Sequence, residues 1–175
     1  GSLSIHETKN IIIKNIKMKN NSNFDDMLHI VYADTIKIEN LYIENSFMDA
    51  IDIDMSSVSI DSVEIDGAGN DAVDLMTSKV VLKSVDLLNS KDKGLSVGED
   101  STAIIINSIL SENKIGIVAK DGSHAYIVNS NLINNNLQLS VYIKNWMYGS
   151  GGHIVVDKSI LHGDNNALKS EKKSS

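Results

Sequence analysis

One acidic pattern occurs twice in the chain, 22 positions apart: Asp49 and Asp52 in FMDAIDIDMSS recur as Asp71 and Asp74 in GNDAVDLMTSK. An aliphatic residue stands on each side of the second aspartate in both copies. Such alternation is typical of a short β-strand, whose successive side chains point to opposite faces. If the aliphatic residues point inward, Asp52 and Asp74 point outward, and stacking the two segments places them side by side.

Stacked carboxylates of this kind favour a cation. Two such groups within about 5 Å repel each other, and solvent or a bound cation relieves the repulsion. Ca²⁺ takes about six to eight oxygen ligands, so Asp49, Asp52, Asp71 and Asp74 are candidate calcium ligands. The alternative is structural: aspartates at strand starts cap turns by accepting backbone N–H bonds, and outward aspartates discourage association between strand edges.

Two outward columns of polar residues would run along this surface. One contains Asp26, Asp49, Asp71 and Lys93, and the other contains His29, Asp52, Asp74 and Ser96. The candidate ligand-binding residues are Asp52, Asp74, His29, Tyr32 and Trp146. A solvated histidine is the alternative for His29, and Trp146 could instead cover the side of the coils.

The acids belong to a repeat that covers most of the chain. Pairs of apolar residues, separated by one position, recur at spacings of 23, 22, 22, 22 and 22 residues. The first column contains Leu28/Ile30, Ile51/Ile53, Val73/Leu75, Leu95/Val97, Ile117/Ala119 and Leu139/Val141. The second contains Ile11/Ile13, Ile36/Ile38, Val58/Ile60, Val80/Leu82, Ala103/Ile105 and Ala125/Ile127. The third contains Ile16/Met18, Leu41/Ile43, Val63/Ile65, Val85/Leu87, Ser108/Leu110 and Ser130/Leu132.

A small polar residue separates the second column from the third. These residues are Asn15, Asn40, Ser62, Ser84, Asn107 and Asn129. Asn tolerates a left-handed backbone, and Asn and Ser bond to nearby backbone groups, as a sharp corner requires. Three short strands in about 22 residues predict an all-β, single-stranded parallel β-helix of about six to seven coils. A helical solenoid would need apolar residues at three- and four-residue spacing instead.

The repeat also sets the expected boundaries. We expect the β-helix over residues 3–167 and a polar, unstructured tail over residues 168–175. The segment YIKNWMYGSGG interrupts the last coils as an insertion. A stack of coils has open strand edges at both ends, and natural proteins cover such edges, so we expect the chain to be part of a larger protein.

Composition narrows the class of ligand. The formal net charge is −7, and the 16 basic residues are all Lys. This charge argues against a nucleic-acid partner and suits cations or neutral, hydroxyl-rich ligands. The absence of Cys excludes disulfides and thiolate metal sites. No apolar stretch approaches the roughly 20 residues of a transmembrane helix.

Four segments carry a resemblance to a known family: DAIDIDMSSVSIDSVEI, GNDAVDLMTSKVVLKSVDL, SKDKGLSVGEDSTAIIINS and NKIGIVAKDGSHAYIVNSNL. They resemble consecutive coils of right-handed parallel β-helix regions in large bacterial surface or secreted proteins, some of which also resemble spore-coat protein kinases. The similarity covers nearly the whole chain and implies an extracellular or cell-surface location. More distantly, the implied fold resembles that of pectate lyases and carbohydrate-binding β-helices, which implies a polysaccharide groove on an outer face but not an activity.

Two functions therefore stand as alternatives. One is a non-catalytic scaffold or binding module, whose partners are polysaccharide, other domains of a parent protein, or further copies bound end to end. The other is a calcium-dependent polysaccharide lyase or epimerase. The resemblance to calcium-dependent pectate lyases implies that the four repeated aspartates hold Ca²⁺ and that Lys93 is the base that abstracts a proton beside a uronate carboxylate. The lack of any Arg to bind that carboxylate weighs against catalysis.

Overall fold

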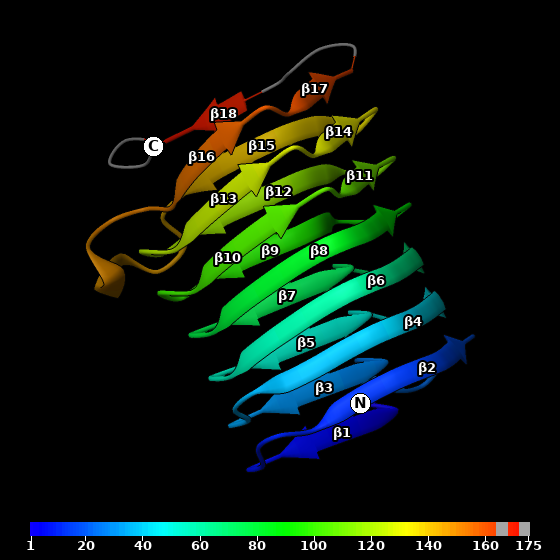
Figure 1. The fold of residues 1–175 in the computed structure, drawn as a ribbon. Coiled ribbons are helices and arrows are strands. Elements are labelled where there is room, and N and C mark those ends of the chain that lie inside the picture. Colours follow the sequence, from blue (N-terminus) through cyan, green and yellow to red (C-terminus); the bar gives the residue numbers. More distant parts are fainter. Residues whose placement is uncertain (164–167, 172–175) are drawn as a thin grey trace.

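Alternating aliphatic residues wind the chain into stacked coils. The computed structural model describes residues 1–163 and 168–171, and its coils lie one above another from β1 and β2 to β16 and β17 (Figure 1). The predicted first column is in register throughout, with Leu28, Ile51, Val73, Leu95, Ile117 and Leu139 paired rung to rung. The parallel β-helix and its 22-residue repeat are confirmed.

One parallel sheet, here called the first sheet, carries the first column. Its strands, in order across the sheet, are β1 (Leu3–His6), β3 (Leu28–Val31), β5 (Ile51–Asp54), β7 (Val73–Met76), β9 (Lys93–Gly98), β12 (Ile115–Lys120), β15 (Leu137–Tyr142) and β18 (Leu168–Ser170). Every pairing within it is parallel, as expected when each coil adds one strand.

The second sheet carries the other two columns. In its first four coils both columns belong to one long, bent strand: β2 (Ile12–Lys19), β4 (Ile36–Ser46), β6 (Ser57–Ala68) and β8 (Lys79–Leu88). In the later coils they are separate strands: β10 (Thr102–Ile106), β11 (Ile109–Ser111), β13 (His124–Val128), β14 (Asn131–Ile133), β16 (His153–Asp157) and β17 (Ile160–His162). The predicted three strands per coil therefore hold in the later coils. There Ser108 N donates to Ser130 Oγ rather than to a backbone carbonyl, which interrupts the ladder at the corner.

The predicted corners have the expected backbone. All six corner residues have positive φ, between 48° at Asn129 and 57° at Asn15 and Ser62. Asn40 Nδ2 donates to Asn15 Oδ1 at 2.7 Å, and Asn129 Nδ2 donates to Asn107 Oδ1 at 2.7 Å. A second left-handed column, absent from the prediction, follows the third strand position at Asn20, Asn45, Gly67, Asn89, Glu112 and Asn134.

The interior is aliphatic, with a ladder of serines at one corner. Ser56, Ser78 and Ser101 are buried, and each accepts a backbone N–H from the preceding coil: Ala33 N to Ser56 Oγ at 2.9 Å, Ser56 N to Ser78 Oγ at 3.0 Å, and Ser78 N to Ser101 Oγ at 3.0 Å. These hydroxyls satisfy buried N–H groups where the chain turns and backbone pairing is interrupted.

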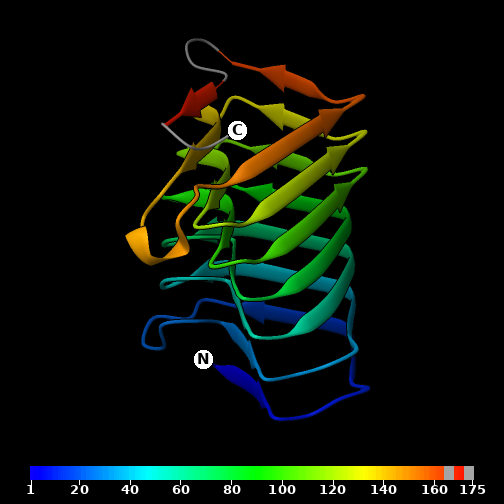
Figure 2. The same ribbon diagram turned by 90° about the vertical axis from the view of Figure 1, so that its left-hand side faces the viewer.

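The predicted insertion projects from the stack beside the first sheet (Figure 2). It contains a short 3₁₀ helix, η1 (Trp146–Tyr148). Asp121 Oδ1 accepts the backbone N–H groups of Lys144 and Asn145, both at 2.7 Å, and Gly122 N donates to Ser150 O at 3.1 Å. Both ends of the insertion are therefore fastened to one corner of the stack.

The end of the chain differs from the expected tail. Leu168–Ser170 form β18, which pairs with β15 with Leu168 opposite Leu139. Leu168 continues the aliphatic column, which explains a strand where the polar composition predicted an unstructured tail. The rest of that tail, residues 172–175, lies outside the described residues. Among residues 1–163 and 168–171, no helix has the length and apolar character needed to cross a membrane.

Candidate functional site

The outward side of β3, β5 and β7, together with the loops that lead into them, forms a surface that we call the acidic face. It consists of Asp26, His29, Asp49, Asp52, Asp54, Asp71 and Asp74. The inward residues of the same strands are fully buried aliphatics, so the strands are held rigidly and present the polar side chains at fixed positions. His29 pairs in register with Asp52, and Asp52 pairs with Asp74.

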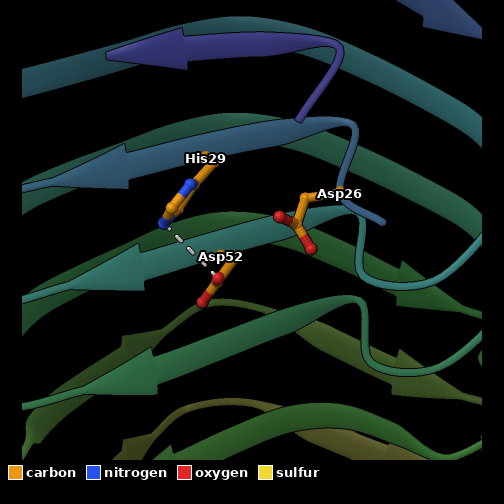
Figure 3. A group of neighbouring side chains, drawn as sticks. All are labelled: Asp26, His29 and Asp52. Atoms are coloured by element: carbon orange, nitrogen blue, oxygen red, sulfur yellow. Dashed lines mark ion pairs between the residues drawn. The ribbon is translucent and has the colours of Figure 1, made fainter. Parts of the chain in front are cut away.

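Three of these side chains converge. Asp26, His29 and Asp52 each bring one possible ligand atom within 4.8 Å of the others, and all three are half-buried (Figure 3). His29 Nε2 lies 3.6 Å from Asp52 Oδ2 and 3.3 Å from Asp54 Oδ2. The ring of His6 on β1 packs edge-on against the ring of His29, with centroids 5.5 Å apart. The structure therefore places His29 among several acids and beside a second imidazole.

The carboxyl of Asp52 has the largest pKa shift among the acids of the acidic face. Burial raises the pKa of its carboxyl to about 8, and the nearby charges of Asp54, Asp26, Asp74 and Asp49 add to the effect. A carboxyl with this pKa holds its proton at neutral pH and can then donate a hydrogen bond.

Asp49 and Asp71 instead hold the backbone. Asp49 Oδ1 accepts Asp71 N at 2.8 Å and Asn70 Nδ2 at 2.8 Å, while Asp71 Oδ1 accepts Lys93 N at 2.9 Å. Each aspartate thus caps the start of the strand in the next coil, as the structural alternative proposed. The four predicted calcium ligands lie on two adjacent coils, but two of them have oxygens committed to these bonds.

The amine of Lys93 forms ion pairs with two aspartates. Its Nζ donates to Asp71 Oδ1 at 3.2 Å and also contacts Asp92, and only 12% of its side chain is exposed. Burial alone would lower the pKa of Lys93, but Asp71 and Asp92 together raise it well above its usual range. The amine is therefore charged at neutral pH, whereas a general base must be uncharged.

A second buried lysine was not identified from the sequence. Lys120 Nζ donates to Ser96 Oγ at 3.0 Å and lies 3.9 Å from Asp74 Oδ1. Burial raises the pKa of the neighbouring Tyr142. The repeat alone could have identified Lys120. Its position at the end of the strand IGIVAK places it in the same outward column as Asp54.

Of the two predicted aromatic residues, only Tyr32 adjoins a strand of the acidic face, whereas Trp146 lies in the insertion after β15. Tyr32 follows β3 with a left-handed φ of 53° and is 58% exposed, and Trp146 in the insertion is 84% exposed. Phe24 and Phe47 were not predicted. They lie in the loops that lead into β3 and β5, and both are more than half exposed.

Comparison with known proteins identifies the family. A family model described as the right-handed beta helix region matches residues 49–174. The chain belongs to the right-handed β-helix family. No curated protein matches this β-helix chain.

Solved structures are similar to this right-handed β-helix chain only distantly. One is the catalytic domain of a GH87 α-1,3-glucanase in complex with nigerose, at 12% identity and a TM-score of 0.45 over 97% of this chain and 50% of that one. Another is QnrB1, a plasmid-mediated fluoroquinolone resistance protein, at 10% identity and a TM-score of 0.28 over 94% of this chain and 91% of that one. The chain spans about half the length of the glucanase domain.

Proposed function

We propose that this β-helix is a non-catalytic binding module whose acidic face binds a polysaccharide. The observation that carries the proposal is the combination of outward carboxyl groups on adjacent coils with exposed aromatic residues at the edge of the same face. Carboxylates accept strong hydrogen bonds from hydroxyl groups. Exposed aromatic rings offer flat apolar surfaces at little entropic cost, which suits the apolar faces of sugar rings.

The charges favour a neutral glycan over a polyuronate. Six aspartates and only His29 form the acidic face, and the two buried lysines beside it are already paired with Asp71, Asp92 or Ser96. A uronate chain would bring further negative charge to this surface, and like charges that are only partly screened repel each other.

The lyase or epimerase alternative has less support. It requires an uncharged base, but the ion pairs of Lys93 with Asp71 and Asp92 keep its amine protonated. Binding without cleavage needs no such base. An extracellular or cell-surface location is part of the proposal, because that is where a polysaccharide-binding module meets its ligand.

A glycan array followed by calorimetry tests the proposal. We expect binding to neutral polysaccharides, a loss of at least about tenfold in affinity for Asp74→Asn or Phe47→Ala, and no change for Glu64→Gln, an exposed acid on the second sheet. Measurements in EDTA separate glycan binding from any effect of metals. Retained affinity in both face variants would refute the binding site, and unsaturated products from a polyuronate in calcium would instead establish a lyase.

A further inference from the structure

The cluster of Asp26, His29 and Asp52 lies within the acidic face and has a mixed nitrogen and oxygen donor set that binding of a neutral polysaccharide does not require. It combines one imidazole nitrogen with carboxylate oxygens from two other positions, one in the loop before β3 and one on β5 (Figure 3). His29 and Asp52 occupy paired positions on adjacent strands, so the rung-to-rung hydrogen bonds hold their backbones in register. Donors that are held in place by rigid strands lose little freedom when they bind an ion.

The separations around His29 Nε2 suit a small divalent ion. Zinc bonds of about 2.0–2.1 Å in a tetrahedron place neighbouring ligand atoms about 3.3–3.4 Å apart. His29 Nε2 lies 3.6 Å from Asp52 Oδ2 and 3.3 Å from Asp54 Oδ2, and the donor atoms of Asp26, His29 and Asp52 all lie within 4.8 Å of one another. Asp26, whose ligand atom lies within 4.8 Å of those of His29 and Asp52, would supply the third ligand.

The nitrogen donor distinguishes this cluster from a calcium site. Ca²⁺ and Mg²⁺ bind oxygen ligands, whereas imidazole suits Zn²⁺ and its neighbours in the first transition series. The ring of His6 lies 5.5 Å from that of His29, which adds a second imidazole at the edge of the cluster. A divalent ion would also offset the charges of the carboxylates gathered around His29.

We propose that Asp26, His29 and Asp52 form a binding site for a divalent transition metal, with Zn²⁺ as the best fit and with at least one coordination position left open to solvent or ligand. The site differs from the calcium site that the sequence suggested, because Asp49 and Asp71 use oxygens to cap the next coil. The proposal is independent of polysaccharide binding.

Calorimetric titration of metal-free protein with zinc is the direct test. We expect one zinc ion per chain, at least about tenfold weaker binding in both His29→Gln and Asp52→Asn, and no competition from millimolar calcium. Cobalt(II) gives a second readout, since a tetrahedral site produces visible absorption that His29→Gln should remove. Circular dichroism of both variants establishes that they are folded.

A matched control excludes adventitious zinc binding. His124 and His153 lie on paired positions of β13 and β16, with rings 5.6 Å apart, and two surface histidines can capture zinc. His124→Ala should therefore leave the zinc affinity unchanged. Three results would overturn the proposal: no zinc binding, zinc binding that survives in folded His29→Gln, or zinc binding that disappears in His124→Ala. Because glycan binding is measured in EDTA, either proposal can fail without the other.

Discussion

The aspartates of the acidic face fall into two groups with different contacts. Asp49 and Asp71 accept backbone N–H bonds from the following coil, whereas Asp52 points outward among other acids, with His29 Nε2 3.6 Å from its Oδ2. The first pair stabilises the turn into each strand. Asp52 has no backbone donor of that kind, so its ionisation is costly in the folded protein.

The raised pKa of Asp52 predicts a pH-dependent stability. Its pKa is about 8 in the folded protein and near 4 in the unfolded chain, so the folded state holds the proton more tightly. The stabilisation is complete below about pH 4 and is lost as the pH rises through 8. After allowance for solvent screening, we expect the metal-free protein to lose about 1–2 kcal/mol of unfolding free energy between pH 5 and pH 9 from this group.

Urea denaturation in EDTA at both pH values measures this loss. Asp52→Asn should remove most of it and should be more stable than the parent at pH 9. Glu64→Gln, on the exposed second sheet, serves as the control. A parent protein that gains stability toward pH 9 would contradict the assignment to Asp52.

The pairing of Lys93 with Asp71 predicts a large effect of removing the lysine. Lys93→Met leaves the carboxylate of Asp71, which is only 2% exposed, without its cation. We expect a loss of about 2–4 kcal/mol in unfolding free energy, because burial already raises the pKa of Asp71 to about 7, and without Lys93 this carboxyl must either stay charged without a partner or take up a proton. Lys114→Met removes an exposed partner of Asp92 and should cost less than about 1 kcal/mol. Equal effects of the two substitutions would show that the Lys93 pair does not act as a buried one.

At the scale of elements, side chains at the corners bond neighbouring coils to one another, in addition to the pairing of the strands. Positive-φ residues form two ladders along the second sheet, and buried serines form a third ladder that accepts N–H groups where the backbone turns. Each ladder adds side-chain bonds between neighbouring coils at a corner.

The serine ladder predicts a specific loss of stability. Ser78→Ala removes the acceptor for Ser56 N and the donor to Met76 O in a buried corner. An unsatisfied buried N–H costs about 1–3 kcal/mol, and we expect a decrease of that size in chemical denaturation. Ser59→Ala, an exposed position on the same coil as Ser56, should change the unfolding free energy by less than about 0.5 kcal/mol. A similar effect at both positions would argue against the ladder.

Much of this element structure could be predicted from the sequence, and the reason is periodicity. Alternation located the strands, and the column of Asn and Ser located one corner, because few other residues adopt a left-handed backbone. The second corner was missed because its residues vary between Asn, Gly and Glu. The acids were placed on the correct face, but alternation gives only the direction of a side chain, so it could not show that Asp49 and Asp71 cap the next coil or that Lys93 is paired.

At the scale of the whole molecule, the final coil exposes residues that are core-facing elsewhere. Val156 pairs with the fully buried Ile127 but is 39% exposed, and Leu161 pairs with the fully buried Leu132 but is 36% exposed. Among residues 1–163 and 168–171, no strand pairs with the far edges of β16 and β17, and exposed aliphatics beside such edges form a surface prone to pairing with another chain.

This surface predicts association end to end. We expect the apparent mass in sedimentation velocity to rise with protein concentration, and Val156→Lys to return the chain to a monomer because a charge on the end surface opposes association. Val155→Lys is the matched control, since Val155 is 41% exposed but points outward from the same strand. A parent protein that stays monomeric at all concentrations, or an equal effect of both substitutions, would refute this mode of association.

The sequence repeat could not predict how the insertion is anchored to the stack. Asp121 Oδ1 accepts two N–H groups from residues about one coil later, and nothing in the spacing of aliphatic residues specifies that contact. Residues that do not belong to the repeat have no equivalent in the neighbouring coils, so their contacts cannot be predicted from it.

The shared register of the rungs has a consequence for how such a protein can change in length. Because every coil presents its side chains at the same positions, the duplication or deletion of one complete coil keeps all remaining columns aligned. The outward surface of the stack would then lengthen or shorten in steps of about 4.8 Å, the distance between neighbouring strands. A gene that gains or loses 22 codons at a time could thereby adjust the number of subsites along its surface while preserving the chemistry of each.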